Sequence, residues 1–199
     1  MKKIKIFIFL LFLFLNTSCQ TQKTFTLVNP GKLEVLNKLY SIETNQSWSQ
    51  FQDESYNFIF WTVNGYSLDR IVFFDPIEDN TSLYDSEAFF TQESEKRPIF
   101  TSDMNKLEIK EFIVNCFLWT RHLTKIETEN LKNYKIDDIP GITFDISGQN
   151  ELGLNYKGFV IAGIKEKKLI TMYFVAAEME YFNKYKKEAK KILSSIKFL

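Results

Sequence analysis

Two apolar runs separated by Asn64-Gly65 form the clearest pattern in the chain. Residues 56–63 and 66–74 are rich in aromatic and β-branched side chains, which is typical of strands. An Asn-Gly pair readily adopts the positive φ angles of a type I′ turn, so the pattern predicts a β-hairpin with a two-residue turn. Both faces of the hairpin carry apolar residues, and we expect it to lie centrally in a sheet.

Two longer segments have the periodicity of amphipathic helices. The first is predicted to begin at an N-cap, Ser102, and to run to about Trp119. Its apolar stripe consists of Ile109, Phe112, Ile113, Cys116 and Phe117. The second is predicted over residues 178–196, with lysines on its polar side. Its apolar stripe consists of Phe182, Tyr185, Ala189, Ile192 and Ile196.

The remaining patterns predict more strands and one irregular segment. Residues 33–42 are predicted to be a strand region, and residues 77–101 a polar surface excursion. Further strands are predicted at residues 123–128, 142–146, 158–164 and 169–176, the last two joined by a hairpin loop at 165–168. Hairpins combined with two separate long helices indicate an α+β fold, an antiparallel sheet packed by helices.

The start of the chain has the layout of a secretory signal peptide. Lysines at positions 2, 3 and 5 precede an unbroken apolar run over residues 6–15. A membrane-spanning helix needs about 20 apolar residues, so this run is too short to be a mature membrane anchor by itself. Small or polar residues, Asn16 to Ser18, then lead to Cys19.

This segment resembles a bacterial lipoprotein signal, in which a small residue precedes the cysteine. The resemblance implies that a diacylglycerol joins the Cys19 thiol and that cleavage makes Cys19 the first residue. Asn16 stands where the family usually has leucine, and a plain secreted protein or a retained N-terminal anchor are the alternatives. We therefore expect a signal peptide at 1–18, a polar tether at 19–30 and a single globular domain at 31–199, held at a bacterial membrane by its lipid. In a two-membrane envelope this is the outer membrane.

Composition and charge narrow the classes of function. Removing residues 1–18 takes away three of the 25 basic residues and leaves 22 against 25 acidic ones. This balance provides no electrostatic footprint for nucleic acid. The lysine-rich stretches at 165–168 and 184–191 are interleaved with Glu166 and Glu188, which favours a solvated face. The chain's 16% aromatic residues predict a large aromatic core.

Candidate chemistry is sparse. Cys116 lies on an apolar helical stripe and is expected to be an inert buried thiol. His122 is the single histidine and cannot form a zinc site without partner ligands. Asp75, Glu78 and Asp79 are close in sequence but match no calcium-loop spacing, so a solvated acidic loop is favoured. We predict no catalytic residue, metal or cofactor, and Cys19 is the one predicted site, for lipid attachment.

The order of elements from Pro140-Gly141 to Ser194-Ser195-Ile196 is similar to the PsbP-like fold, an α/β/α sandwich around an antiparallel sheet. Residues 61–68 also resemble uncharacterised bacterial envelope lipoproteins of that fold. The resemblance implies a non-enzymatic module that binds or helps assemble an envelope protein partner. The alternative is an envelope carrier or sensor for a small apolar or amphipathic ligand, for which the many aromatic residues would line a pocket.

Overall fold

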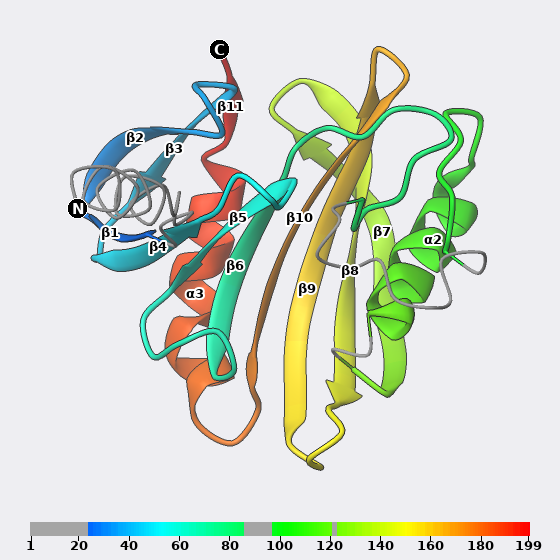
Figure 1. Cartoon of the computed structure of the whole chain (residues 1–199). Helices are drawn as coiled ribbons and strands as arrows, with labels where there is room; N and C mark the ends of the chain where they lie inside the picture. The colour runs from blue at the N-terminus through cyan, green and yellow to red at the C-terminus, as the bar shows by residue number, and fades with distance from the viewer. Residues whose placement is uncertain (1–23, 86–96, 121–122) are drawn as a thin grey trace, which may run out of the picture.

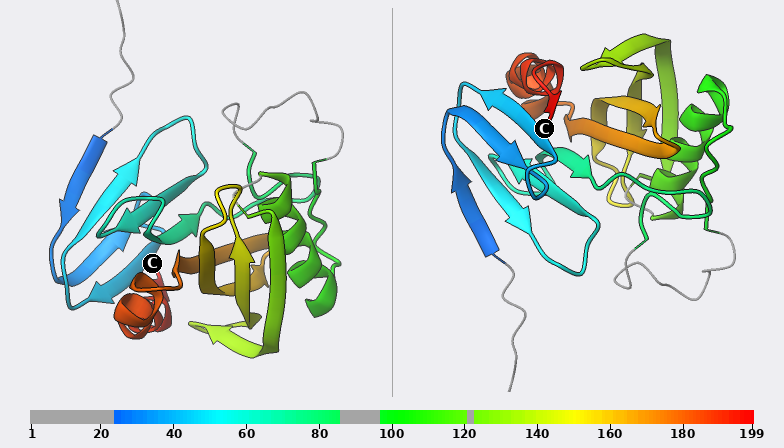
Figure 2. Two further views of the ribbon diagram at one scale, coloured as in Figure 1. Left: turned by 90° about the horizontal axis from the view of Figure 1, so that it is seen from below. Right: turned by 90° about the horizontal axis from the view of Figure 1, so that it is seen from above.

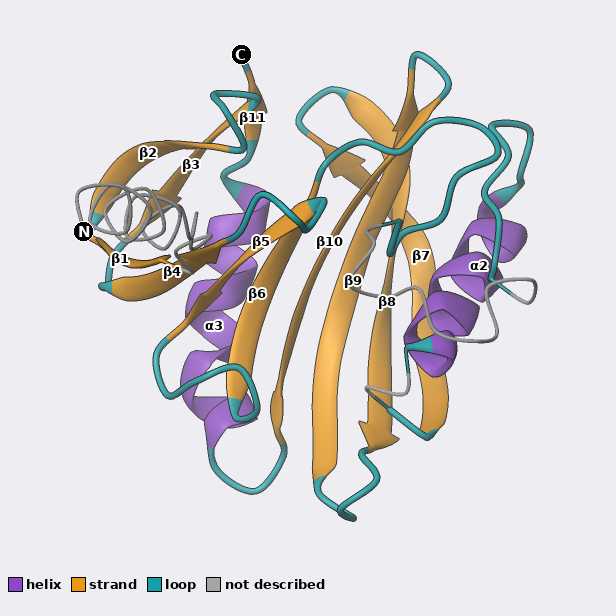
Figure 3. Cartoon of the chain, viewed as in Figure 1, coloured by secondary structure: helices purple, strands orange, loops and turns teal. Residues whose placement is uncertain are grey.

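The computed structural model describes residues 24–85, 97–120 and 123–199. These residues form strands and two helices, shown in Figure 1 and, by type, in Figure 3. The strands are β1 (Thr24–Val28), β2 (Gly31–Val35), β3 (Tyr40–Thr44), β4 (Trp48–Gln52), β5 (Phe58–Thr62), β6 (Asp69–Phe74), β7 (Lys125–Ile136), β8 (Ile139–Gln149), β9 (Asn155–Lys165), β10 (Lys168–Ala177) and β11 (Lys197–Phe198). The helices are α2 (Lys106–Trp119) and α3 (Tyr181–Ser194).

The described strands form one large and one small antiparallel sheet. The large sheet has the order β1-β4-β5-β6-β10-β9-β8-β7, and the small one the order β11-β3-β2. Helix α2 lies on one face of the large sheet, while α3 and the small sheet lie on the other (Figure 2). The fold is therefore α+β, an antiparallel sheet packed by helices, as the sequence predicts.

Hydrophobic side chains fill both faces of the large sheet. On β5, Phe58 and Phe60 point to the face covered by α2, where they share a cluster with Phe112. Ile59 and Trp61 alternate with them and point to the face covered by α3. We call these two clusters the α2 core and the α3 core. Because both faces of β5 and β6 are buried, these strands lie inside the sheet, which confirms the central position predicted for the hairpin.

The predicted two-residue turn between β5 and β6 is wrong. Residues 63–68 connect the strands, and among them only Gly65 has a positive φ, of 102°. The buried Asp69 carboxylate organises this loop, since it accepts hydrogen bonds from the amide nitrogens of Val63 (2.8 Å) and Asn64 (2.9 Å). The side-chain amide of Asn64 donates to the same carboxylate at 2.7 Å. The Asn-Gly pair therefore sits in a wider loop built around a carboxylate.

Helix α2 begins three residues later than predicted. Its N-cap is Asn105, whose side-chain oxygen accepts hydrogen bonds from the amides of Leu107 (2.9 Å) and Glu108 (3.2 Å). Glu108 completes a capping box by accepting from the Asn105 amide at 2.7 Å. Ser102, the predicted N-cap, donates instead through its hydroxyl to Asp79 at 3.0 Å. The helix therefore starts where both a capping side chain and its reciprocal partner are present.

The described part of residues 77–101 is not a surface excursion. Ile77 bridges Leu169 on β10. Leu83, Tyr84 and Phe100 are buried in the α2 core, with at most 1% of each exposed. Leu83 and Tyr84 are adjacent to each other and Phe100 is far from both in sequence, so no helical or strand period indicated their burial.

The N-terminal part of the domain also departs from prediction. The segment predicted as a tether at 19–30 contains β1, which pairs along its length with β4 and forms one edge of the large sheet. The single strand region expected at 33–42 is a hairpin of β2 and β3, with positive φ angles at residues 36–38. The chain therefore enters the sheet earlier than its polarity suggests.

Candidate functional site

A groove runs on the α3 side of the large sheet, between α3 and the strands β7, β8 and β9. It consists of two adjoining hollows of about 870 and 450 Å³, which share Asp145, Phe159 and Lys190. The helix wall carries Lys186, Lys187, Lys190 and Lys191. The strand wall carries the acidic residues Glu127, Glu129 and Asp145 together with Lys132 and Lys157. Phe159, Ile161 and Phe182 supply apolar surface between the two charged walls.

The periodicity of α3 places its lysines at the groove. Tyr185, Ala189 and Ile192 are buried in the α3 core and fix which side of the helix faces the sheet. Lys186 and Lys190 each follow one of these buried residues, so they lie at the flank of the buried stripe and above the strands. The lysine-rich stretch that the sequence presents as a solvated face therefore forms one wall of a groove.

A β-bulge in β7 determines which residues of this strand line the groove. The register between β7 and β8 shifts between Glu129 and Lys132, where Asn130 has a φ of 55°. The extra residue changes which positions of β7 face α3, so Glu129 before the bulge and Lys132 after it both line the groove. The β7–β8 hairpin also curves toward α3 in Figure 2.

The charges of the two walls do not neutralise each other across the groove. The ammonium groups of Lys186 and Lys190 lie over the rings of Phe182 and Phe159, at 5.1 and 5.5 Å from the centroids. Neither forms an ion pair with a carboxylate among the described residues. Asp145 accepts a hydrogen bond from the Asn130 side chain at 2.8 Å. The groove thus presents both signs of charge, and apolar surface, to whatever enters it.

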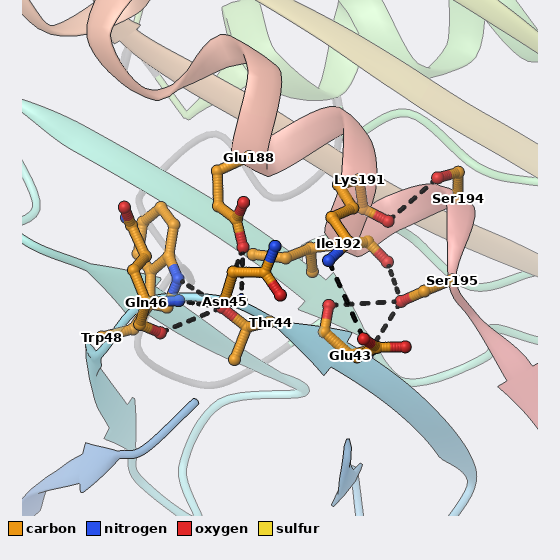
Figure 4. Close-up of polar contacts among 10 residues, drawn as sticks. All are labelled: Glu43, Thr44, Asn45, Gln46, Trp48, Glu188, Lys191, Ile192, Ser194 and Ser195. Atoms are coloured by element: carbon orange, nitrogen blue, oxygen red, sulfur yellow. Dashed lines mark hydrogen bonds and ion pairs between the residues drawn. The ribbon is translucent and has the colours of Figure 1, made fainter. Parts of the chain in front are cut away.

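Helix α3 is fixed in place by a polar cluster at the end of β3 (Figure 4). The Glu188 carboxylate accepts hydrogen bonds from the Asn45 amide at 2.6 Å and the Thr44 hydroxyl at 3.3 Å. The indole of Trp48 donates to the same hydroxyl at 3.1 Å. At the C-cap of the helix, the Ser195 hydroxyl accepts from the Glu43 amide at 2.8 Å. These bonds hold the helix wall of the groove against the small sheet, so Glu188 does not belong to a solvated face.

A buried cation lies on the opposite side of the sheet. Arg70 is 5% exposed, donates through Nη1 to the Tyr66 carbonyl at 2.9 Å, and stacks its guanidinium 4.3 Å from the centre of the Tyr66 ring. Its Nε has no hydrogen-bond partner within the described chain. Burial raises the pKa of Tyr66 and Tyr84, so these phenols stay neutral. The adjacent hollow, of about 10 Å³, has room for about one water molecule.

Among the candidate residues, the structure describes Cys116 and the acids near Pro76. Cys116 is fully buried, and burial raises the pKa of its thiol to about 12, which confirms the inert thiol that the sequence predicts. Cys19 and His122 lie outside the described residues. The acids near Pro76 do not converge: Glu78 pairs with Lys168 at 2.7 Å, and Asp79 binds Ser102.

The described residues contain neither a cluster of metal-binding side chains nor a helix that could span a membrane. No group of three or more histidine, cysteine or acidic side chains gathers in residues 24–85, 97–120 and 123–199 as metal ligands would. Neither α2 nor α3, the helices of that same part of the chain, combines the length and apolarity needed to cross a membrane.

The fold resembles solved structures, whereas no protein-family model and no curated protein sequence matches the chain. A crystal structure from Bacteroides thetaiotaomicron aligns with a TM-score of 0.50 at 11% identity, covering 86% of this chain and 49% of that one. The chain therefore spans about half the length of the Bacteroides protein. The Saccharomyces cerevisiae Ran-binding protein Mog1p aligns at 0.47 and 8% identity, covering 89% and 96%. Cyanobacterial PsbP from Synechocystis aligns at 0.45 and 9% identity, covering 92% and 99%. The similarity to the Bacteroides structure is one of fold alone.

Sequence reasoning missed both the groove and the buried arginine. A signal for the strand wall was present in the alternation of Glu127 and Glu129 with Ile126 and Thr128, which places both acids on one face. The burial of Arg70 had no such signal, because a charged residue at the start of a strand is ordinarily exposed.

Proposed function

We propose that this chain is a lipid-anchored, non-enzymatic binding module of the bacterial cell envelope, and that its groove takes a segment of a protein partner. The groove is the observation that supports the proposal, because it combines apolar side chains with a helix wall of lysines and a strand wall that carries both acidic and basic side chains. Peptide segments supply apolar side chains and both signs of charge together. The alternative function, a carrier or sensor, needs an enclosed pocket for a small apolar ligand. The hollow beside Arg70 is too small to hold such a ligand, so it does not support this alternative.

The anchor is tested by removing the thiol that would carry the lipid. A Cys19→Ser variant should move from the membrane fraction to the soluble exported fraction, since a diacylglyceryl group supplies the two acyl chains that stable anchoring needs. Equal membrane retention of the variant would contradict the lipid anchor and would indicate an uncleaved N-terminal anchor.

The groove is tested by crosslinking in intact cells. A photoreactive amino acid at position 190, inside the groove, should form a discrete adduct with one partner, and the charge reversal Lys186→Glu should abolish it. The matched control places the probe at position 184, on the same helix but outside both hollows. An adduct of equal yield at both positions, or one unaffected by Lys186→Glu, would contradict binding in the groove.

A further inference from the structure

One edge of the large sheet is uncharged and apolar. Strand β1 forms this edge and pairs only with β4 in the described sheet. Phe25 and Leu27 are two residues apart, so they point to the same side of β1, and they are 62% and 68% exposed. Phe25 contacts the rings of the buried Phe51 and Phe60, with centroids at 5.3 and 6.3 Å, so this side of β1 lies at the edge of the α2 core.

The other edge of the sheet is built differently. Strand β7 carries Lys125, Glu127, Glu129, Lys132 and Lys135, and it contains a β-bulge. Charges and bulges are the usual devices that stop an edge strand from pairing with other molecules. Strand β1 has neither device, since no residue from Thr24 to Val28 is charged and its pairing with β4 is regular. This edge and its exposed apolar side chains are therefore open to contact with another surface.

The distance to the proposed lipid identifies that surface. Cys19 precedes Thr24 by five residues, and five residues of fully extended chain reach at most about 18 Å. On the proposed function, the Cys19 thioether lies in the headgroup region of the membrane. The start of β1 is then confined to within that reach of the lipid surface, whereas no such constraint acts on the charged edge at β7.

We infer that the face of β1 bearing Phe25 and Leu27 rests on the lipid bilayer and inserts its apolar side chains among the headgroups. This inference rests on the lipid anchor in the proposed function. Phenylalanine and leucine are the side chains that interfacial segments place at the boundary of headgroups and acyl chains. The contact would fix the orientation of the domain on the membrane.

The test measures the depth of one side chain in the lipidated, full-length protein. A Leu27→Cys variant, recovered from the membrane fraction, is labelled with a polarity-sensitive fluorophore and reconstituted in vesicles of phosphatidylethanolamine and phosphatidylglycerol. The Cys19 thiol is consumed by the lipid and Cys116 is buried, so the introduced cysteine is labelled alone. The matched control is Leu152→Cys, at a position 92% exposed in the loop between β8 and β9.

The fluorophore at position 27 should shift to the blue on vesicles and lose intensity when lipids carrying acyl-chain spin labels are added. The control at position 152 should show neither change, and Phe25→Cys should repeat the result for position 27. A membrane-bound protein whose label at 27 behaves like that at 152 would overturn the inference and leave the anchor intact. A blue shift without quenching would overturn it in favour of a second protein copy on β1. A chain found among the soluble exported proteins would remove the anchor, and the inference with it.

Discussion

At the scale of single residues, Asp69 organises the loop between β5 and β6. It is fully buried, and its carboxylate accepts hydrogen bonds from the loop amides of Val63 and Asn64. The carboxylate needs these donors, because a buried charged group without hydrogen-bond partners is strongly unfavourable. The loop therefore takes its shape from one carboxylate at the start of β6.

Replacing Asp69 by alanine should reduce the free energy of unfolding by about 2–4 kcal/mol, since several donors lose a charged acceptor at once. Urea denaturation followed by circular dichroism measures the change. The control is Asp138→Ala, at an exposed position in the turn between β7 and β8, which should alter stability by less than about 0.5 kcal/mol. Equal effects of the two substitutions would show that the loop does not depend on the carboxylate.

The buried phenol of Tyr84 predicts a loss of stability at high pH. Burial raises its pKa well above the ordinary value of 10.0, and its hydroxyl lies 3.3 Å from that of Tyr173. A raised pKa in the folded state means that the unfolded state releases its proton first. The stabilising contribution is therefore complete below pH 10 and is lost as the pH rises above that value. Melting temperatures from pH 8 to 11 should fall less steeply for Tyr84→Phe than for the unaltered chain.

The limits of sequence prediction are visible in two turns. Asn64-Gly65 has the composition of a two-residue turn, yet the buried Asp69 imposes a longer loop there. Between β9 and β10, Glu166 and Lys167 adopt φ angles of 51° and 64°, although neither residue favours them. In that hairpin, the long pairing of β9 with β10 fixes the length of the connection. Local propensity therefore identified the hairpins, whereas tertiary contacts decided the turns.

At the scale of elements, α3 joins the two sheets. Its buried side packs on β10 and β9, while Glu188 and Ser195 bond to the end of β3. A Glu188→Ala substitution should reduce the free energy of unfolding by about 1–2 kcal/mol, because it removes a charged acceptor from a partly exposed amide. Thermal denaturation measures the loss, and Lys187→Ala, an exposed position of the same helix, is the control. A control variant destabilised as much as Glu188→Ala would contradict the joining role.

Elements whose apolar residues recur at a regular helical or strand spacing were predicted well, and the other elements were not. The apolar stripe of α2 is buried as expected, because helical spacing leaves few ways to pack those residues. The alternation at Ile142, Phe144 and Ile146 likewise appears in β8. Strand β1 was missed, because its exposed edge position permits polar and apolar residues alike. The groove itself was beyond prediction, since its walls meet only through the packing of α3 over strands far away in sequence.

At the scale of the whole molecule, the C-terminal strand closes the small sheet. Strand β11 pairs with β3, and Phe198 packs edge-on against the fully buried Tyr40 with ring centroids 5.0 Å apart. Phe198 also lies beneath the ammonium group of Lys165, 4.2 Å from the ring centre. The start and the end of the domain are thus held together in one packed unit.

A chain shortened to end at Ile196 should lose about 1–3 kcal/mol of stability, because the Phe198 ring and its contacts are removed. Scanning calorimetry of both chains measures the difference in melting temperature. Leu199→Ala, which alters a 64% exposed side chain, is the control and should have almost no effect. An unchanged melting temperature for the shortened chain would show that β11 does not contribute to the closed structure.

The order of strands also governs when the protein can fold during its synthesis. Strand β6 pairs with β10, and β3 pairs with β11, so the first strands of the sheet receive their neighbours from the last part of the chain to leave the ribosome. In a nascent chain that ends before β10, β6 can pair with β5 alone, and no α3 is present to cover the apolar side of β5. Such distant pairing slows folding and keeps a growing chain open. On the export that we propose for this chain, such a delay would keep it unfolded while it is threaded through a narrow translocon.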